Sequence, residues 1–173
     1  TQRRDLDLMV AMGTWAGKDL ANDKHRIPTM VISASDPLSA GIIKSVEDSG
    51  FDHVHATIDP RLHHRQLRVF HDLVGFKRLG VAFENSVPGR SYAAMDVIEE
   101  LREELGYEIV PCYTQSDISD TKVAEFSVIS CFQELVRKSD AIYVTSQGGV
   151  TQNSLPKLVQ IANRHHIPTF SQT

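Results

Sequence analysis

The sequence predicts an α/β protein of two Rossmann-like lobes, each a parallel sheet flanked by helices, with the first lobe incomplete. Three observations predict this fold. Short apolar runs alternate with amphipathic helical patterns along the chain, which favours parallel sheets with crossover helices. Polar loops follow three of the apolar runs, at 13–17, 84–91 and 145–149. A motif, His25-Arg-Ile-Pro-Thr-Met30, recurs as His165-His-Ile-Pro-Thr-Phe170.

The repeated motif indicates the domain organisation. Each copy follows a helical pattern and, before it, a strand pattern opened by Asp7 or Asp140. Either the two halves are copies of one strand-helix-strand unit, or two similar junctions arose by chance, because Ile-Pro entering a buried strand is common. The first reading places lobe one at 1–57 and lobe two at 58–173. Lobe one then holds two convincing strands, too few for a stable sheet, so we expect further strands in a segment before Thr1.

The elements of lobe one follow from its apolar periodicity and its breakers. Buried strands are predicted over 5–12 and 27–33, with a short extended stretch over 54–58. A short helix is predicted over 16–22. A second helix carries Leu38, Ile42, Ile43 and Val46 on one face and ends at Gly50.

Lobe two has a more regular pattern. Strands are predicted over 77–83, 107–113, 140–144 and 169–171, and helices over 61–73, 91–105, 122–138 and 152–166. Asp59 is expected to cap the helix over 61–73, with Pro60 at its first position. Glu99, Glu100, Glu103 and Glu104 fall on the outer face of their helix, which indicates a solvated surface.

Polar loops at the ends of the predicted strands indicate a ligand site. The carboxyl ends of parallel strands meet at one edge of a sheet, where helix amino termini favour anions and polar oxygens. The candidates in lobe one are Thr14, Trp15, Ser35 and Asp36. Those in lobe two are Glu84, Asn85, Ser86, Arg90, Ser91, Thr145, Ser146 and Gln147.

Several candidates have an ordinary structural role as the alternative. Arg90 and Ser91 suit a carboxylate or phosphate, but Ser91 is equally an N-cap with Arg90 in solvent. Asp36 either caps the following helix or points into the site. Trp15 either stacks on a ligand or forms a wedge between lobes. The pair Gly148-Gly149 either supplies positive φ or lets the backbone approach a ligand.

Composition and motifs exclude several classes of protein. The chain has 173 residues, a net charge of −4 and a pI near 6.0, so it has no electrostatic footprint for nucleic acid. No apolar run approaches the roughly 20 residues of a membrane-spanning helix. Phosphate-loop, dinucleotide, zinc-protease and serine-hydrolase motifs are absent. Adjacent histidines, His63-His64 and His165-His166, point to different helix faces and are expected in solvent. We therefore expect no catalytic residue, no cofactor and no metal.

The sequence contains two cysteines, Cys112 and Cys131. They are too few for a disulfide framework and lack metal-ligand spacing. Two separate buried thiols are the favoured interpretation. A disulfide is the alternative if the protein resides in an oxidising compartment.

Four segments carry a family resemblance: Ser33-Ala-Ser-Asp-Pro-Leu-Ser-Ala-Gly-Ile-Ile-Lys-Ser45, Gly80-Val-Ala-Phe83, Asp140-Ala-Ile-Tyr-Val144 and Ile167-Pro-Thr-Phe170. Through them the sequence resembles the ABC transporter substrate-binding protein family, whose members have the type I periplasmic-binding-protein fold. Their order and spacing agree across essentially the whole chain. By this resemblance the chain corresponds to the later half of lobe one and most of lobe two, and is expected to be a fragment lacking the N-terminal part of lobe one.

The resemblance implies the solute-binding component of an ABC importer. Such a protein closes by a hinge on a small polar or aromatic molecule, such as an amino acid, held between its lobes. Its partners are the solute and the ABC permease subunits, and it has no nucleic-acid partner. It is periplasmic or extracytoplasmic and peripheral to the membrane only through the permease or a lipid anchor. The alternatives are a ligand-binding sensory domain on the same fold and, less favoured, an enzyme using the same crevice.

Two loops depart from the family pattern. Where members often carry Tyr-Asn-x-Ser-Glu-x-Asn-Ser, this sequence has 83–91, which keeps Ser91 and places Arg90 where members have Asn. The family's Pro-Thr-Asp-Asn-Thr loop is 145–149 here, so that Gln147 stands in place of an acid. An acid there would pair with a ligand ammonium, so its absence bears on whether the solute is an amino acid.

Overall fold

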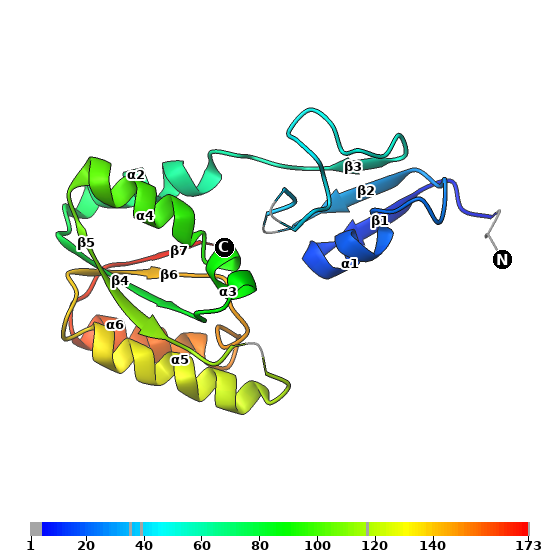
Figure 1. The fold of residues 1–173 in the computed structure, drawn as a ribbon. Helices are drawn as coiled ribbons and strands as arrows, with labels where there is room; N and C mark the ends of the chain where they lie inside the picture. The colour runs from blue at the N-terminus through cyan, green and yellow to red at the C-terminus, as the bar shows by residue number, and fades with distance from the viewer. Residues whose placement is uncertain (1–4, 35, 39, 117, 173) are drawn as a thin grey trace. The chain divides into compact units, whose positions relative to one another are not determined.

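The structure is a computed structural model that describes residues 5–34, 36–38, 40–116 and 118–172. The chain divides into two compact units, Thr1–Pro60 and Arg61–Thr173. Strands alternate with helices through the second unit and the first part of the first unit, as Figure 1 shows. All strand pairs of the described residues are parallel. The predicted α/β class with parallel sheets flanked by helices is confirmed.

The first unit is built on a three-stranded sheet in the order β1-β2-β3. The elements are β1 (Met9–Met12), α1 (Gly13–Leu20), β2 (Thr29–Ile32) and β3 (Val54–Ala56). The short stretch predicted near 54–58 therefore forms a third strand. Helix α1 packs closely on β2 at Gly17, where only a glycine leaves enough room. A Cβ there would lie 2.6 Å from Val31 Cγ1 and 2.8 Å from Ile42 Cδ1. The core joins strand residues to the segment after β2: Ala11, Val31, Ile42, Ile43, Val54 and Ala56.

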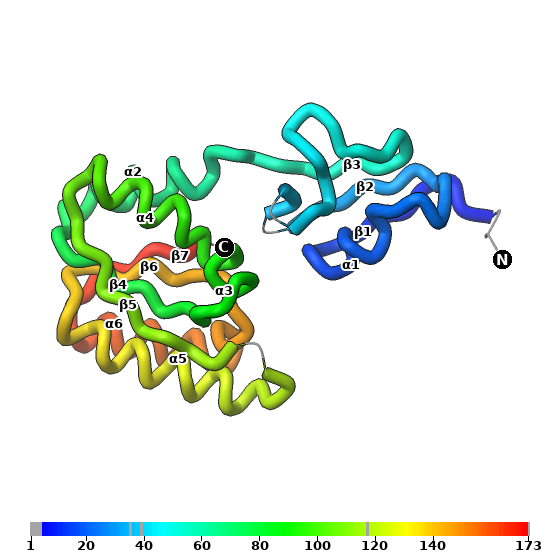
Figure 2. The backbone as a smooth tube through the Cα atoms, in the orientation of Figure 1, coloured from blue at the N-terminus to red at the C-terminus, as the bar shows by residue number. Residues whose placement is uncertain are grey.

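The helix predicted to end at Gly50 is absent from the described residues of 36–50, which form turns and bends (Figure 2). Asp36 Oδ1 accepts from Leu38 N at 3.0 Å, and Gly41 has a φ of 69°, which interrupts a helix. Ser45 Oγ then accepts from Asp48 N at 3.0 Å. Local side-chain hydrogen bonds thus outcompete the helical ladder. Ile42 and Ile43 are buried, as the pattern predicted.

The second unit is a four-stranded sheet in the order β5-β4-β6-β7. Its strands are β4 (Arg78–Phe83), β5 (Glu108–Tyr113), β6 (Ala141–Val144) and β7 (Thr169–Ser171). Its helices are α2 (Leu62–Val74), α3 (Val87–Tyr92), α4 (Met95–Leu105), α5 (Thr121–Leu135) and α6 (Leu155–Arg164). The strands match the predicted ones closely.

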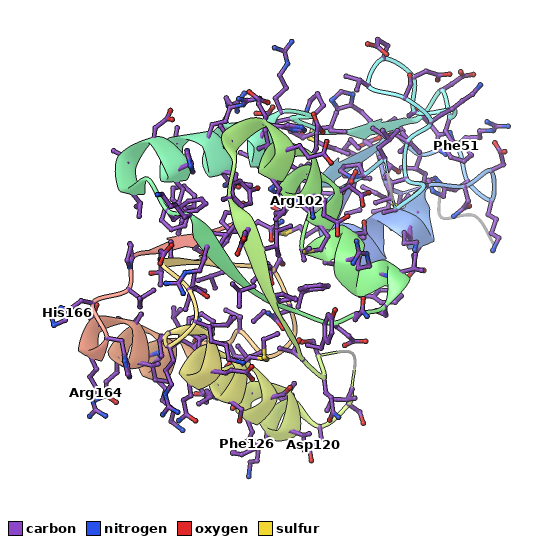
Figure 3. The ribbon with its side chains drawn as sticks, turned by 60° about the vertical axis from the view of Figure 1, so that its left-hand side comes forward. Phe51, Arg102, Asp120, Phe126, Arg164 and His166 are labelled. Atoms are coloured by element: carbon purple, nitrogen blue, oxygen red, sulfur yellow. A yellow bond between two sulfur atoms is a disulfide. The ribbon has the colours of Figure 1, made fainter. Side chains whose placement is uncertain are left out.

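Helices cover both faces of this sheet, with α2 and α4 on one side and α5 and α6 on the other (Figure 1). Alternation along β4 explains how both faces are apolar. Val81 belongs to the cluster that includes Leu67 and Ile98, whereas Ala82 belongs to the cluster that includes Val128 and Leu158. Figure 3 shows the opposite face of α5, where Phe126 projects away from the sheet.

Two predicted helix starts are wrong. The helix predicted over 91–105 is divided into α3 and α4, because Ala94 adopts a left-handed φ of 53° between them. Helix α3 begins before Ser91, with Ser86 as its N-cap: Ser86 Oγ accepts from Gly89 N at 3.1 Å. Helix α2 has Arg61 rather than Asp59 at its N-cap.

The two cysteines form a disulfide rather than the two separate buried thiols that the sequence favours. Cys112 lies in β5 and Cys131 in α5, with their Cα atoms 5.6 Å apart. The sequence could not decide this, because neither a strand nor a helix prediction fixes the distance between two side chains in different layers. The bond ties a strand of the sheet to the helix that covers it.

Candidate functional site

The second sheet has a topological switch point between β4 and β6. From β4 the chain passes through α3 and α4 to β5 on one side, and from β5 it returns through α5 to β6 on the other side. The connections leaving the carboxyl ends of β4 and β6 therefore diverge, and in open α/β sheets this is the edge at which ligands bind. The candidate loops after β4 and β6 both begin there.

Gln147 is the centre of a hydrogen-bond network at this edge. Its Nε2 donates to the Ala82 carbonyl oxygen at 2.7 Å and to Thr145 Oγ1 at 3.0 Å. Its Oε1 accepts from Thr114 Oγ1 at 2.7 Å and from Ser116 Oγ at 2.6 Å. A side-chain amide has two donor hydrogens and two acceptor positions, so this set of partners uses all four.

Neighbouring candidates belong to the same network. The buried Thr145 donates to the Ala82 carbonyl at 2.7 Å, and Glu84 Oε2 accepts from Ser116 N at 2.7 Å. The structure thus brings Glu84, of the loop after β4, together with Thr145 and Gln147, of the loop after β6. It joins them through Thr114 and Ser116, which directly follow β5.

A second glutamine, Gln172, joins the remaining loops of this edge. It follows β7 and is buried, with only 4% of its surface exposed. Its Oε1 accepts from Ser146 N at 2.8 Å, and its Nε2 donates to the Tyr92 carbonyl at 2.9 Å. Gln66 of α2 donates to the Gln172 carbonyl at 3.1 Å. Ser146 is therefore held by β7 and α3, next to the Gln147 network.

Arg90 and Ser91 occupy α3, but their roles differ from the predicted N-cap. Arg90 Nη2 donates to Glu99 Oε1 of α4 at 2.8 Å, and its guanidinium lies 5.9 Å from the Phe83 ring centroid. The hydrogen bond to Glu99 raises the pKa of Arg90 above its usual value. Ser91 is half-buried in the last turn of α3. Asn85, between β4 and the Ser86 cap, is exposed.

The candidates of the first unit also lie after neighbouring strands. Thr14 and Trp15 belong to the first turn of α1, directly after β1, rather than to a loop. Thr14 is buried, whereas 73% of Trp15 is exposed with Lys18 Nζ 5.9 Å from its ring centroid. Asp36 follows β2, the partner of β1, and initiates a turn. Ser35 lies outside the described residues.

Gly148 and Gly149 have a different role from both of those considered. Neither has a positive φ. A Cβ at Gly148 would lie 2.6 Å from the Ser116 carbonyl oxygen, and one at Gly149 would lie 2.4 Å from the Ala124 carbonyl oxygen. These glycines let the loop after β6 approach the protein's own backbone, which brings Gln147 within reach of Thr114 and Ser116.

An open hollow of about 1020 Å³ lies within the first unit, away from these candidates. It is lined near the amino ends of the strands, by Leu8, Thr29 and Val54 among others. None of the predicted ligand-binding residues lines it. Since open α/β sheets bind ligands at the carboxyl ends of strands, we do not assign the site to this hollow.

The described residues meet the requirements of neither a metal site nor a membrane-spanning helix. No group of three or more His, Cys, Asp or Glu side chains in the described part of the chain is arranged to hold a metal ion. Likewise, none of the described helices is long and apolar enough to cross a membrane. The expected surface histidines are only partly found: His165 and His166 are exposed, whereas His64 Nε2 lies 3.1 Å from Glu100 Oε2 and His63 Nδ1 lies 3.2 Å from Gln66 Oε1.

Sequence reasoning missed Thr114, Ser116 and Gln172. Thr114 and Ser116 carry the same signal as the predicted site residues, since they are polar and lie within three residues of the end of a predicted strand. Gln172 was one residue past the last predicted strand. The edge as a whole presents hydroxyl, amide and carboxylate groups above an apolar sheet, which is the chemistry that holds a small polar molecule by hydrogen bonds.

Comparison with known proteins gives one consistent result. The chain is 27% identical over 166 residues to a tyrosine-binding protein of Clostridioides difficile strain R20291, covering 95% of this chain and 45% of that protein. It is 25% identical to the ligand-free, open structure of CD0873, a substrate binding protein with adhesive properties from Clostridium difficile, with a TM-score of 0.68 over 95% of this chain and 52% of that one.

Two further solved structures share the fold. A conserved domain protein from Vibrio cholerae has a TM-score of 0.71 at 20% identity, over 95% of this chain and 52% of that one. An ABC domain from Streptococcus pneumoniae in complex with L-Trp has a TM-score of 0.68 at 19% identity, over 95% of this chain and 54% of that one. The chain thus spans about half the length of these relatives. The family model of the ABC transporter substrate binding protein matches residues 2–173, and the chain belongs to that family.

Proposed function

We propose that this chain is part of the solute-binding component of an ABC importer and that the solute is a small polar or aromatic molecule of the amino-acid class. The observation that carries the proposal is the convergence of the loops after β4, β5 and β6 on Gln147 at the switch point of the sheet. In a protein of this family, such an edge is where a solute is expected. The proposed role is binding without chemical conversion.

The relatives support the amino-acid class. One is named for tyrosine, and solved structures of the same fold are complexes with L-Trp and with Leu. Gln147 has no charge and all its hydrogen-bonding positions are used within the protein. We therefore propose that an ammonium group is met by Glu84, the carboxylate next to this network.

The proposed mode of binding is hinge closure, in which the bound solute stabilises the closed state through contacts that the open state lacks. The proposed partners are ABC permease subunits, and the proposed location is periplasmic or extracytoplasmic. The Cys112–Cys131 disulfide supports that location, because disulfides persist in oxidising compartments.

The test begins with the protein purified under native conditions. Mass spectrometry of the small molecules that copurify should identify an amino acid or a close analogue. After removal of this solute, calorimetric titration with L-tyrosine, L-tryptophan and L-leucine should show saturable binding of at least one. Uptake of the radiolabelled solute should fall when the coding region is deleted. A protein that binds none of these solutes and copurifies with none contradicts the proposal.

A charge-neutral variant tests the role of Glu84. Glu84→Gln should weaken binding of an amino acid by about tenfold or more, since a hydrogen bond to a charged group contributes about 1.5–3 kcal/mol. Glu103→Gln is the matched control, because Glu103 lies on the exposed side of α4 with 80% of its side chain in solvent. Equal affinities of the two variants contradict the role of Glu84.

A further inference from the structure

Strand β5 lies at an edge of the second sheet and leads into residues of the candidate site. It is an edge strand, hydrogen-bonded to β4 on one side only. It contains Pro111, which has no N–H to donate, and proline within a sheet is confined to such edges. Its carboxyl end nevertheless carries Thr114 and Ser116, two partners of Gln147. The ladder to β4 reaches Thr114, whose N–H donates to the Phe83 carbonyl oxygen at 2.9 Å, so the residues after Thr114 need a further support to stay in place.

The disulfide is placed to do this. Cys112 lies two residues before Thr114, and Cys131 lies in the second half of α5, on its sheet-facing side, where it is buried. The bond closes a loop with a sequence separation of 19 that includes residues 114–116 and the start of α5. The same loop is tied to α5 a second time, because Gln115 N donates to Ser127 Oγ at 2.9 Å.

We propose that the Cys112–Cys131 disulfide is a positioning element of the solute site, which staples the carboxyl end of edge strand β5 to α5 and so holds Thr114 and Ser116 against Gln147 and Glu84. Breaking it leaves the β5 end held by the β4 ladder and by single hydrogen bonds. The loop then opens locally, and the Gln147 amide loses two of its four partners for part of the time. Solute affinity falls as the competent arrangement becomes less populated.

The test compares the double variant Cys112→Ala/Cys131→Ala with the wild type. The control is Ile98→Val, a substitution in the core under α4, on the other face of the sheet. Both variants should lower the melting temperature. Only the disulfide variant should accelerate hydrogen exchange of the Gln115 and Ser116 amides, by about tenfold or more, because the staple restrains local opening of its own loop. The wild type reduced with a phosphine and alkylated should behave like the double variant, which removes the effect of the substitutions themselves.

The binding measurement rests on the proposed function and uses L-tyrosine, L-tryptophan and L-leucine as probes. The double variant should bind the probe that the wild type binds about tenfold more weakly, while Ile98→Val binds it as the wild type does. If the wild type binds none of the three probes and copurifies with no amino acid, the proposed function fails, and the hydrogen-exchange measurement alone decides whether the disulfide is a positioning element. The proposal is overturned if hydrogen exchange at the Gln115 and Ser116 amides is unchanged in both the double variant and the reduced wild type. Recovery of two free thiols from the untreated denatured protein overturns it as well.

Discussion

Single polar side chains organise this protein at the residue scale, and Gln147 is the main example. Glutamine is a residue type common in exposed loops, yet the Gln147 amide forms hydrogen bonds that join the ends of three strands. The sequence predicts that Gln147 follows a strand, but it does not show which backbone carbonyl oxygen accepts a hydrogen bond from its amide. Its partners are 31 to 65 residues away, apart from Thr145.

Replacing Gln147 tests this structural role. Gln147→Leu keeps the approximate volume and removes all four hydrogen bonds, so it should lower the free energy of unfolding by about 1–3 kcal/mol, the cost of leaving partly buried partners unsatisfied. Urea denaturation measures the change. Gln152→Leu is the control, because Gln152 is exposed, and it should change stability by less than about 0.5 kcal/mol. Equal effects of the two substitutions contradict the assignment of Gln147 as a hub.

Asp140 provides the second residue-scale prediction. Its carboxylate accepts from Arg78 Nη2 at 2.6 Å and from the backbone N–H groups of Arg78 and Lys77 at 2.9 and 3.1 Å. The hydrogen bond from the Arg78 side chain is the main cause of a lowered pKa of Asp140. A carboxyl group with a lowered folded-state pKa stabilises the protein above its unfolded pKa, near about 4, and loses that contribution as the pH falls through the folded value.

The wild type should therefore lose stability on acidification below about pH 4 more steeply than Asp140→Asn, which cannot titrate at this position. Asn keeps an acceptor for the backbone N–H groups, so the comparison isolates the charge. The measurement is the free energy of unfolding in urea at a series of pH values. The effect is modest, because the ion pair is partly exposed and screened by solvent. Parallel pH profiles of the two proteins contradict the prediction.

At the scale of elements, the periodicity of apolar residues and the positions of Gly and Pro predict most strands and helices. The strands of the second unit matched because continuous apolar runs such as 79–83 have few alternatives when both faces are buried. The helix over 38–50 was wrong because Ile42 and Ile43 satisfy a helical period and are equally well buried by a turn. Local competition from Asp36, Gly41 and Ser45 decided between them.

Helix ends were harder to predict than helices. Ser86 and Ser91 both follow β4 in sequence. Only the hydrogen bond from Gly89 N to Ser86 Oγ identifies Ser86 as the N-cap of α3. Gly89 itself has to be a glycine, since a Cβ there would lie 2.3 Å from the Glu84 carbonyl oxygen. Such contacts depend on how the chain turns after β4, which a periodicity does not encode. The candidate residues of this loop were therefore found as a group, while their individual roles were not.

The N-cap of α5 gives the element-scale prediction. Asp120 Oδ1 accepts from Lys122 N at 3.0 Å and also contacts Val123 N, so it satisfies amides that the helix leaves unpaired. Figure 3 shows Asp120 at the start of that helix. Asp120→Ala should lower the free energy of unfolding by about 1 kcal/mol, whereas Asp120→Asn, which keeps an acceptor, should cost less. Thermal or urea unfolding checks the order. A larger loss in Asp120→Asn contradicts it.

At the scale of the whole chain, the repeated motif corresponds to a real likeness in topology. Both copies lead into strands, β2 and β7, and each of these pairs in parallel with the strand before it, β1 or β6, across a single helix. The predicted division after residue 57 lies close to the division of the chain after Pro60. We propose that the two units are parts of the two lobes of the family.

The two units differ in how well their sheets are covered. In the second unit, helices cover both faces of the sheet (Figure 1). In the described part of the first unit, the outer face of the sheet has large exposed apolar side chains, with 53% of Val10, 69% of Met12 and 42% of Met30 in solvent. Exposed apolar surface of this kind contributes little to folding, and a unit of about 60 residues is marginal even with a good core.

The two units should therefore differ when each is produced alone. Residues 61–173 should unfold cooperatively in urea and give a dispersed amide NMR spectrum, because their apolar clusters lie within that segment. Residues 1–60 alone should give a poorly dispersed spectrum and no cooperative transition. Met12→Lys in the full chain is a matched test of the exposed face, since a charge at a solvent position changes stability by less than about 0.5 kcal/mol. A cooperative 1–60, or a full chain strongly destabilised by Met12→Lys, contradicts the view that this face adds little to the stability of the chain.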